Sequence, residues 1–231
     1  MEILIIKGCV DAGADSECSI ITEQMKLYGA QPDVMAPQNT EEVFSGLAKR
    51  AGKHYDYIYL ISHGNEQSFG TNDDSISITW DNFAQALCEF DIMNEECTLM
   101  LSCCRGGLNQ VAHSLFYACP KIDYVIGPRQ SLVANDLLVA FNIIFYNLMF
   151  RAVDAVIACK KVELGTDLRF VCFDRLEVAT DPSFYHYKLE MESKMKRQVA
   201  ASLDRLEEQW IPPEVLKLRK DNAAGNPEAA N

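Results

Sequence analysis

Short apolar runs alternate with segments of helical periodicity along most of this chain, and no other feature of the sequence limits the fold as strongly. The apolar runs are rich in β-branched and aromatic residues and lie at 1–8, 55–62, 97–103, 122–127 and 168–173. The segments typical of helices lie at 16–27, 40–52, 79–90, 108–119, 135–150 and 152–162. Strands that are apolar on both sides and alternate with helices indicate a mostly parallel sheet with both faces covered. We therefore expect an α/β fold, a three-layer sandwich with a central sheet of about five or six strands.

The alternating pattern ends near residue 180. We expect residues 1–180 to form one domain and residues 181–211 to form an amphipathic helix, because apolar residues recur at three- and four-residue steps from Met195 to Trp210. This helix is expected either to pack on its own domain or to dock a partner helix. Residues 212–231 begin with two prolines, end in the sequence DNAAGNPEAAN and are predicted to be a flexible tail.

Three polar residues are predicted to begin helices. Thr40 and Thr79 precede the helical segments that follow them, and Asp136 stands at the start of the apolar segment that runs to Phe150. Each has a side-chain oxygen that can accept a hydrogen bond from a backbone N–H of the first turn, so each is a predicted N-cap.

Charge and hydropathy exclude several classes of function. The net charge of −12 makes a nucleic-acid partner unfavourable, because an acidic surface repels phosphates. The longest apolar run, Leu137 to Phe150, is shorter than the roughly 20 residues of a membrane span. The N-terminal apolar run is too short for export, so we expect a cytoplasmic protein. The nine cysteines include no CxxC pair and are expected to be reduced thiols, with no bound metal.

Two predicted strands end in residues that can carry chemistry. The run at 55–62 is followed by His63 and Gly64, and the run at 97–103 ends at Cys103 and Cys104. One helical crossover joins these strands, so they are expected to be parallel neighbours whose carboxyl ends share one edge of the sheet. A thiol and an imidazole at this edge form a nucleophile and a base in outline. Taken singly, the histidine also fits a strand-ending turn and the cysteines fit core thiols.

The two adjacent cysteines are not equivalent. Successive side chains on an extended strand point to opposite faces, so only one of Cys103 and Cys104 is expected to reach His63.

Both strand ends resemble a known family. The sequences YLISHG, ending at His63 and Gly64, and LMLSCCRGG, ending at Gly107, resemble the histidine and cysteine motifs of caspase-like cysteine peptidases. The segment from Ala134 to Lys160 is similar to the CHAT-domain segment in which an Asp opens a helix with a Phe-Tyr pair. The resemblance covers roughly Met1 to Asp174 and is closest to compact CHAT-domain and bacterial caspase-like proteins.

This resemblance implies a function and roles for the residues. Cys104, directly before Arg-Gly-Gly, corresponds to the nucleophile, His63 to the general base, and the backbone N–H groups of Gly64 and Cys104 to an oxyanion hole. The implied reaction is hydrolysis of peptide bonds in a protein or peptide through a thioester, without a cofactor or metal. Activation by a protein partner or by oligomerisation, and a role in bacterial stress or phage defence, are also implied. The alternative is a catalytically silent module of this family that binds a partner.

Three further residues are candidates for substrate binding. Ser102 stands two positions before the nucleophile, where metacaspases have an Asp that accompanies cleavage after basic residues, so this position gives no support for a basic preference. Arg129 is a candidate for binding an acidic side chain, with an ordinary surface arginine as the alternative. Asp136 is a candidate wall of the pocket for the P1 side chain, the residue before the cleaved bond, besides its predicted capping role.

Overall fold

The computed structural model describes residues 1–210, except for the side chains of 203, 204 and 206–210. The chain divides into two compact units, of which the first is Met1–Asp181 and the second begins at Pro182. The boundary lies close to the predicted one near residue 180.

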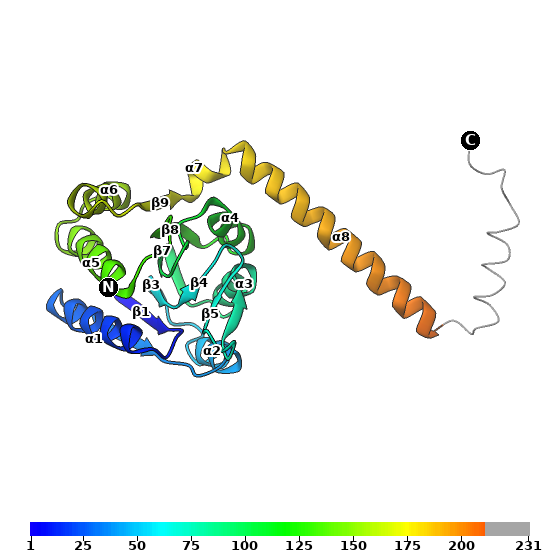
Figure 1. The fold of residues 1–231 in the computed structure, drawn as a ribbon. Helices are drawn as coiled ribbons and strands as arrows, with labels where there is room; N and C mark the ends of the chain where they lie inside the picture. The colour runs from blue at the N-terminus through cyan, green and yellow to red at the C-terminus, as the bar shows by residue number, and fades with distance from the viewer. Residues whose placement is uncertain (211–231) are drawn as a thin grey trace, which may run out of the picture. The chain divides into compact units, whose positions relative to one another are not determined.

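A six-stranded sheet forms the centre of the first unit (Figure 1). Its strands, in spatial order, are β2 (Gln31–Met35), β1 (Glu2–Lys7), β3 (Tyr55–Ile61), β7 (Met93–Ser102), β8 (Ile122–Pro128) and β9 (Phe170–Asp174). The first five are parallel and β9 runs antiparallel to β8. The predicted mostly parallel sheet is therefore confirmed, with a sixth strand, β2, that was not predicted from the sequence.

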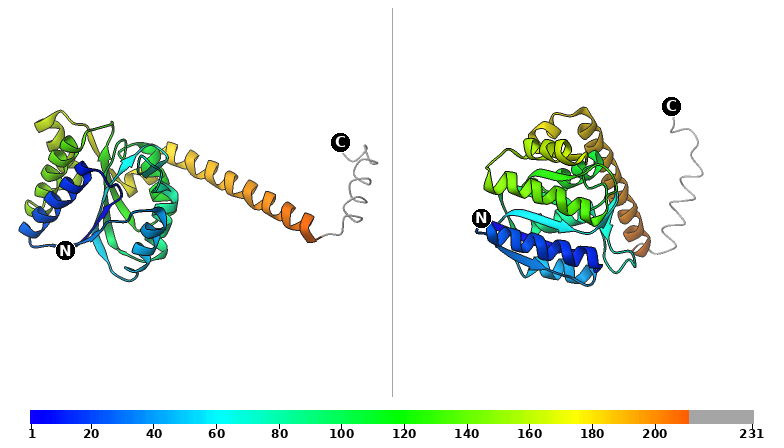
Figure 2. Two further views of the ribbon diagram at one scale, coloured as in Figure 1. Left: turned by 60° about the horizontal axis from the view of Figure 1, so that its bottom comes forward. Right: turned by 60° about the vertical axis from the view of Figure 1, so that its left-hand side comes forward.

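Helices cover both faces of this sheet, as Figure 2 shows in its left view. One layer consists of α1 (Ala12–Leu27), α5 (Ala134–Phe145) and α6 (Ala155–Thr166), in which α5 contacts both of the others. The opposite layer consists of α2 (Thr40–Ala48), α3 (Trp80–Glu89) and α4 (Asn109–Ala118), in which α3 contacts both of the others. The α/β three-layer sandwich predicted from the sequence is confirmed.

Alternate residues of the strands build the core on the side of α1 and α5. Ile3 and Ile5 of β1, together with Tyr59 of β3, are buried in one apolar cluster with residues of both helices. The Tyr59 ring lies 4.9 Å from the ring of Phe141 and 5.2 Å from that of Phe145, centroid to centroid, in edge-to-face geometry. This packing holds α1 and α5 against one face of the sheet.

A small second sheet was not predicted. The strands β4 (His63–Gly64), β5 (Ser68–Gly70) and β6 (Ser77–Thr79) form an antiparallel sheet in a region that the sequence indicates only as a loop. Strands of two or three residues are too short to show alternation, which explains why the pattern did not indicate them.

Some predicted helix ends are shifted. Thr79 is the N-cap of α3, as predicted, and accepts a hydrogen bond from the Asn82 N–H. The N-cap of α2 is Asn39, so the prediction of Thr40 is wrong by one residue, because the Asn39 side chain accepts the Glu42 N–H. The prediction of Asp136 as an N-cap is also wrong, since Val133 precedes the first residue of α5 and the carboxylate lies within the first turn.

The end of the apolar segment beyond α5 differs from a single regular helix. Residues Tyr146–Phe150 form a π-helical turn, η1, and the short helix α7 (Arg175–Ala179) follows β9. Among the described residues, no helix combines the length and the apolar character needed to cross a membrane.

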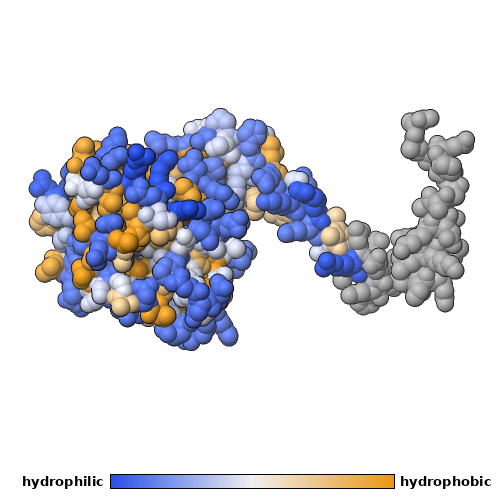
Figure 3. All heavy atoms as spheres, viewed as in Figure 1, coloured by the Kyte–Doolittle hydropathy of each residue, from blue (hydrophilic) through white to orange (hydrophobic). Residues whose placement is uncertain are grey.

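The second unit consists, where it is described, of the single helix α8 (Pro182–Trp210). Its surface is mainly hydrophilic in Figure 3, although it exposes apolar side chains at Tyr185, Leu189, Met195 and Val199. Whether this helix packs on its own domain or docks a partner stays a prediction. The predicted flexible tail at 212–231 lies outside the described residues.

Candidate active site

The register of β3 and β7 brings the two predicted motifs to one edge of the sheet. Ile61 pairs with Ser102, and the Ser62 N–H donates to the Ser102 carbonyl at 3.2 Å. His63 and Cys104 each lie two residues beyond this pair. Both line a cavity of about 70 Å³ at the carboxyl ends of the strands.

The two cysteines have different surroundings. β7 ends at Ser102, so both thiols lie in the loop that follows rather than on the strand. Cys103 is completely buried, and this burial raises the pKa of its thiol well above the ordinary range. Cys104 is half-buried and lines the cavity. Of the two, Cys104 is the thiol that a molecule in the cavity can contact.

The Cys104 thiol has a main-chain partner in this structure. Its Sγ lies 3.6 Å from the carbonyl oxygen of Leu132, in the segment that leads into α5. In the described part of the chain, the hydrogen bonds of Cys104 do not include His63. Hydrogen bonds between catalytic groups often tighten only when a substrate is bound.

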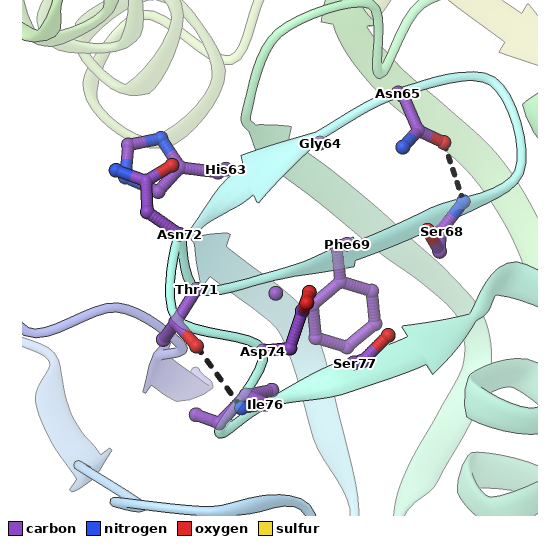
Figure 4. Close-up of a pocket in the computed structure, with 11 residues that line it drawn as sticks. His63, Gly64, Asn65, Ser68, Phe69, Thr71, Asn72, Asp74, Ile76 and Ser77 are labelled. Atoms are coloured by element: carbon purple, nitrogen blue, oxygen red, sulfur yellow. Dashed lines mark hydrogen bonds between the residues drawn. The ribbon is translucent and has the colours of Figure 1, made fainter.

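The His63 imidazole is held by side chains from the start of α1 and from the loop between β5 and β6. The His63 Nε2 lies 3.2 Å from Oδ2 of Asp11. The same Nε2 lies 3.3 Å from the side-chain amide nitrogen of Asn72. Figure 4 shows Asn72 next to the imidazole at the start of β4. Nε2 is thus occupied by protein groups, which leaves Nδ1 as the ring nitrogen available to a substrate or a thiol.

The Asp11 carboxylate serves two partners. Asp11 is the N-cap of α1, and its Oδ1 accepts the Ala14 N–H at 2.8 Å while Oδ2 faces His63. The Ala14 hydrogen bond and then the charge of His63 lower the pKa of Asp11. The sequence did not indicate this contact, although an Asp just before a helical segment is a visible capping signal.

Gly64 is packed closely against the cysteine loop. A Cβ placed on this residue would lie 3.0 Å from the Cys103 sulfur and 3.2 Å from the Cys104 carbonyl oxygen. The Asn65 N–H donates to the Ser68 carbonyl at 2.9 Å, and alternation in an antiparallel pair then directs the Gly64 N–H away from β5. In the part of the chain that the structure describes, the Cys104 N–H donates to no protein acceptor. Both amides are therefore available to a ligand.

A buried carboxylate lies at the inner end of the cavity. Glu17, on α1, is only 2% exposed and lines the cavity with Ser102. The hydroxyls of Tyr59 and Ser102 both donate to its Oε1. Burial raises the pKa of Glu17 to about 7, although these two hydrogen bonds oppose the shift. No sequence pattern indicated this residue, because α1 carries mostly polar side chains.

The three candidate substrate-binding residues are separated in the structure. Ser102 lines the cavity, whereas neither Arg129 nor Asp136 is among its lining residues. The exposed Arg129 guanidinium lies 5.9 Å from the centre of the Phe173 ring, and Asp136 lies half-buried in the first turn of α5. Their binding roles stay predictions without support from the shape of this cavity.

His63 also lines a second, more polar pocket. It has a volume of about 300 Å³ and is formed by the small sheet and the loop between β5 and β6 (Figure 4). Phe69 and Ile76 supply apolar contacts in it, while most of the other lining residues are polar. An extended ligand passing His63 can therefore contact both pockets.

No group of three His, Cys, Asp or Glu side chains with an arrangement suited to a metal occurs among the described residues. A comparison with protein-family models finds no match for this chain, and a comparison with curated protein sequences also finds none. The chemistry of the site is therefore argued from its residues alone.

Proposed function

We propose that this protein is a cysteine endopeptidase in which Cys104 is the nucleophile and His63 is the general base. The observation that carries the proposal is the cavity that Cys104 and His63 share at the carboxyl edge of the sheet. Open α/β sheets bind their ligands at this edge. An accessible thiol and an imidazole lining one cavity are the groups that covalent acyl transfer needs.

The reaction has two steps. His63 accepts the proton of the Cys104 thiol, and the sulfur forms a bond to the carbonyl carbon of the substrate peptide. His63 then donates this proton to the leaving amine as the C–N bond breaks, which leaves a thioester on Cys104. In the second step, a water molecule gives a proton to His63 and attacks the thioester, releasing a carboxylic acid and restoring the thiol.

Two backbone amides are suited to stabilise the negative oxygen of the tetrahedral intermediates. The N–H of Gly64 is directed away from β5, and the N–H of Cys104 has no protein acceptor among the described residues. Preorganised donors of this kind stabilise charge that develops only in the transition state. The absence of a Gly64 side chain lets the β4 backbone pack closely against the loop that carries Cys103 and Cys104.

Labelling by an electrophilic peptide probe tests the proposal. The wild-type protein is incubated with a library of peptide acyloxymethyl ketones, and the labelled residue is identified by mass spectrometry. We expect label on Cys104, loss of label in Cys104→Ala, and retention in Cys103→Ala, the matched control. The same variants are then compared for cleavage of a peptide library. Equal labelling of wild type and Cys104→Ala would contradict the assigned nucleophile.

We also propose a cytoplasmic setting, in which the nine cysteines, all free in this structure, stay reduced. A partner or self-association that activates the enzyme is part of this proposal, so the labelling is repeated with a lysate of the source cells added. If Cys104 is not labelled and no peptide is cleaved, either with or without the lysate, the result would favour a partner-binding module instead of a peptidase.

A further inference from the structure

The cavity beside Cys104 has the dimensions of a pocket for one side chain. Its volume is about 70 Å³. About 10–15 Å³ of such space accommodates one water-sized group, so the cavity accepts about five to seven non-hydrogen atoms. The side chains of lysine and arginine are in this size range. Part of its wall is apolar, with Ala134 and Leu137 from α5 available to contact an aliphatic chain.

The inner end of the cavity is acidic, in contrast to the apolar part of its wall. Glu17 is a carboxylate, and no Lys, Arg or His of the described chain forms an ion pair with it. Both of its hydrogen bonds, from Tyr59 and Ser102, go to Oε1, which leaves Oε2 for a further partner. A buried carboxylate without a counter-charge is unfavourable, and a cation that enters the cavity removes this cost.

We propose that Glu17 is the specificity-determining residue of this site and binds the cationic end of a lysine or arginine side chain at P1. This inference rests on the proposed peptidase function, because the cavity opens beside the proposed nucleophile. In such a complex the aliphatic part of the P1 side chain contacts Ala134 and Leu137, and its charged nitrogen donates to Oε2 of Glu17.

Ser102 acquires a defined role in this arrangement. Its hydroxyl donates to Glu17 and so positions the carboxylate from the strand that leads to Cys104. The acidic group of the pocket, Glu17, therefore comes from α1. Ser102, two residues before the proposed nucleophile Cys104, donates a hydrogen bond to it. An apolar P1 side chain of the same length leaves Glu17 without a counter-charge, and an acidic one is repelled.

A pair of matched probes tests the assignment. Peptide acyloxymethyl ketones are prepared with P1 lysine and with P1 norleucine, which has a similar aliphatic chain but lacks the ammonium group. We expect the wild-type protein to react with the lysine probe at least about tenfold faster, expressed as the inactivation rate divided by the inhibition constant. In Glu17→Gln, which keeps the size of the side chain, this preference is expected to fall severalfold, to what Asp11, the other carboxylate that lines the cavity, contributes.

A measurement on the wild-type protein covers the case in which Glu17→Gln does not fold. The preference for lysine over norleucine is expected to rise between pH 6 and pH 8, as Glu17 becomes ionised. Steps that both probes share in their reaction with Cys104 cancel in this ratio. A norleucine rate equal to the lysine rate, or an unchanged preference in Glu17→Gln, would overturn the inference while Cys104 is still labelled. Absence of label at Cys104 with every probe would overturn the proposed function itself.

Discussion

The Asp11 carboxylate joins the first helix of the domain to the His63 imidazole. One oxygen accepts the Ala14 N–H at 2.8 Å as the N-cap of α1, and the other lies 3.2 Å from His63 Nε2. The cap fixes the side chain in one orientation, so the helix start determines where the imidazole is held. Asp11 is thus a positioning residue for the proposed general base.

Replacement of Asp11 by Asn is expected to lower kcat/KM about two- to tenfold, the effect of one weakened hydrogen bond at a half-exposed site. The fold should be unaffected, since Asn is also a good N-cap. Asp11→Ala is the comparison, because it removes both contacts and is expected to lower the free energy of unfolding by about 1 kcal/mol as well. Steady-state kinetics and urea unfolding of both variants separate the positioning of His63 from the capping of α1. Wild-type kinetics in Asp11→Asn would contradict the positioning role.

The neighbouring cysteines are expected to separate stability from activity. Cys103→Ala leaves a small cavity in a fully buried site and should cost about 1 kcal/mol of unfolding free energy, with Cys104 still reactive. Cys104→Ala should leave the unfolding free energy nearly unchanged and abolish turnover. Urea unfolding and peptide cleavage of both variants check this, and the reverse pattern would assign Cys103 as the nucleophile.

The edge of the sheet that carries the site could be predicted from the sequence for a physical reason. A single helical crossover between two apolar strands makes them parallel neighbours, so His63 and Cys104 had to reach the same edge. The prediction that the two cysteines differ rested on side-chain alternation along a strand, whereas β7 ends at Ser102, before either thiol. β9 is antiparallel to its neighbour, and no local feature of an apolar strand determines its direction.

The residues around His63 and Cys104, the proposed catalytic dyad, depend on tertiary contacts. Glu17 lies on a helix with a polar sequence, and only the packing of α1 against β3 and β7 buries it. Asp11 signals a helix start, yet its second contact comes from β4, more than 50 residues further along the chain. Local patterns carry no information about such contacts, which is why the sequence indicated the dyad and missed the carboxylates around it.

Gly64 has little room for a side chain. In Gly64→Ala the new Cβ would lie 3.0 Å from the Cys103 sulfur and 3.2 Å from the Cys104 carbonyl oxygen, so β4 and the cysteine loop are expected to move apart by a few tenths of an ångström and to misplace the Gly64 N–H in the proposed oxyanion hole. We expect kcat to fall by roughly 10²-fold, the effect of one lost donor. Gly165→Ala is the control, because nothing lies within 4 Å of that position in α6. It should keep full activity and gain up to about 1 kcal/mol in stability, and equal kinetics in both variants would contradict the role of Gly64.

The buried Glu17 carboxyl makes stability depend on pH. Burial raises its pKa from 4.5 to about 7, so between these values the folded protein holds a proton that the unfolded chain has released. The unfolded state then binds fewer protons, and the free energy of unfolding falls as the pH rises through this window, by about 3 kcal/mol in total. Above pH 7 both states are ionised at this position and the difference stays constant.

Glu17→Gln removes this titration and keeps the size of the side chain. Urea unfolding of wild type and variant at pH 5, 6, 7 and 8 measures the difference in unfolding free energy between them. Because other titrating groups are common to both proteins, this difference should shift in favour of the variant by about 3 kcal/mol from pH 5 to pH 8. A difference that does not vary with pH would show that Glu17 is ionised throughout, and that it needs no substrate cation to hold its charge in the cavity.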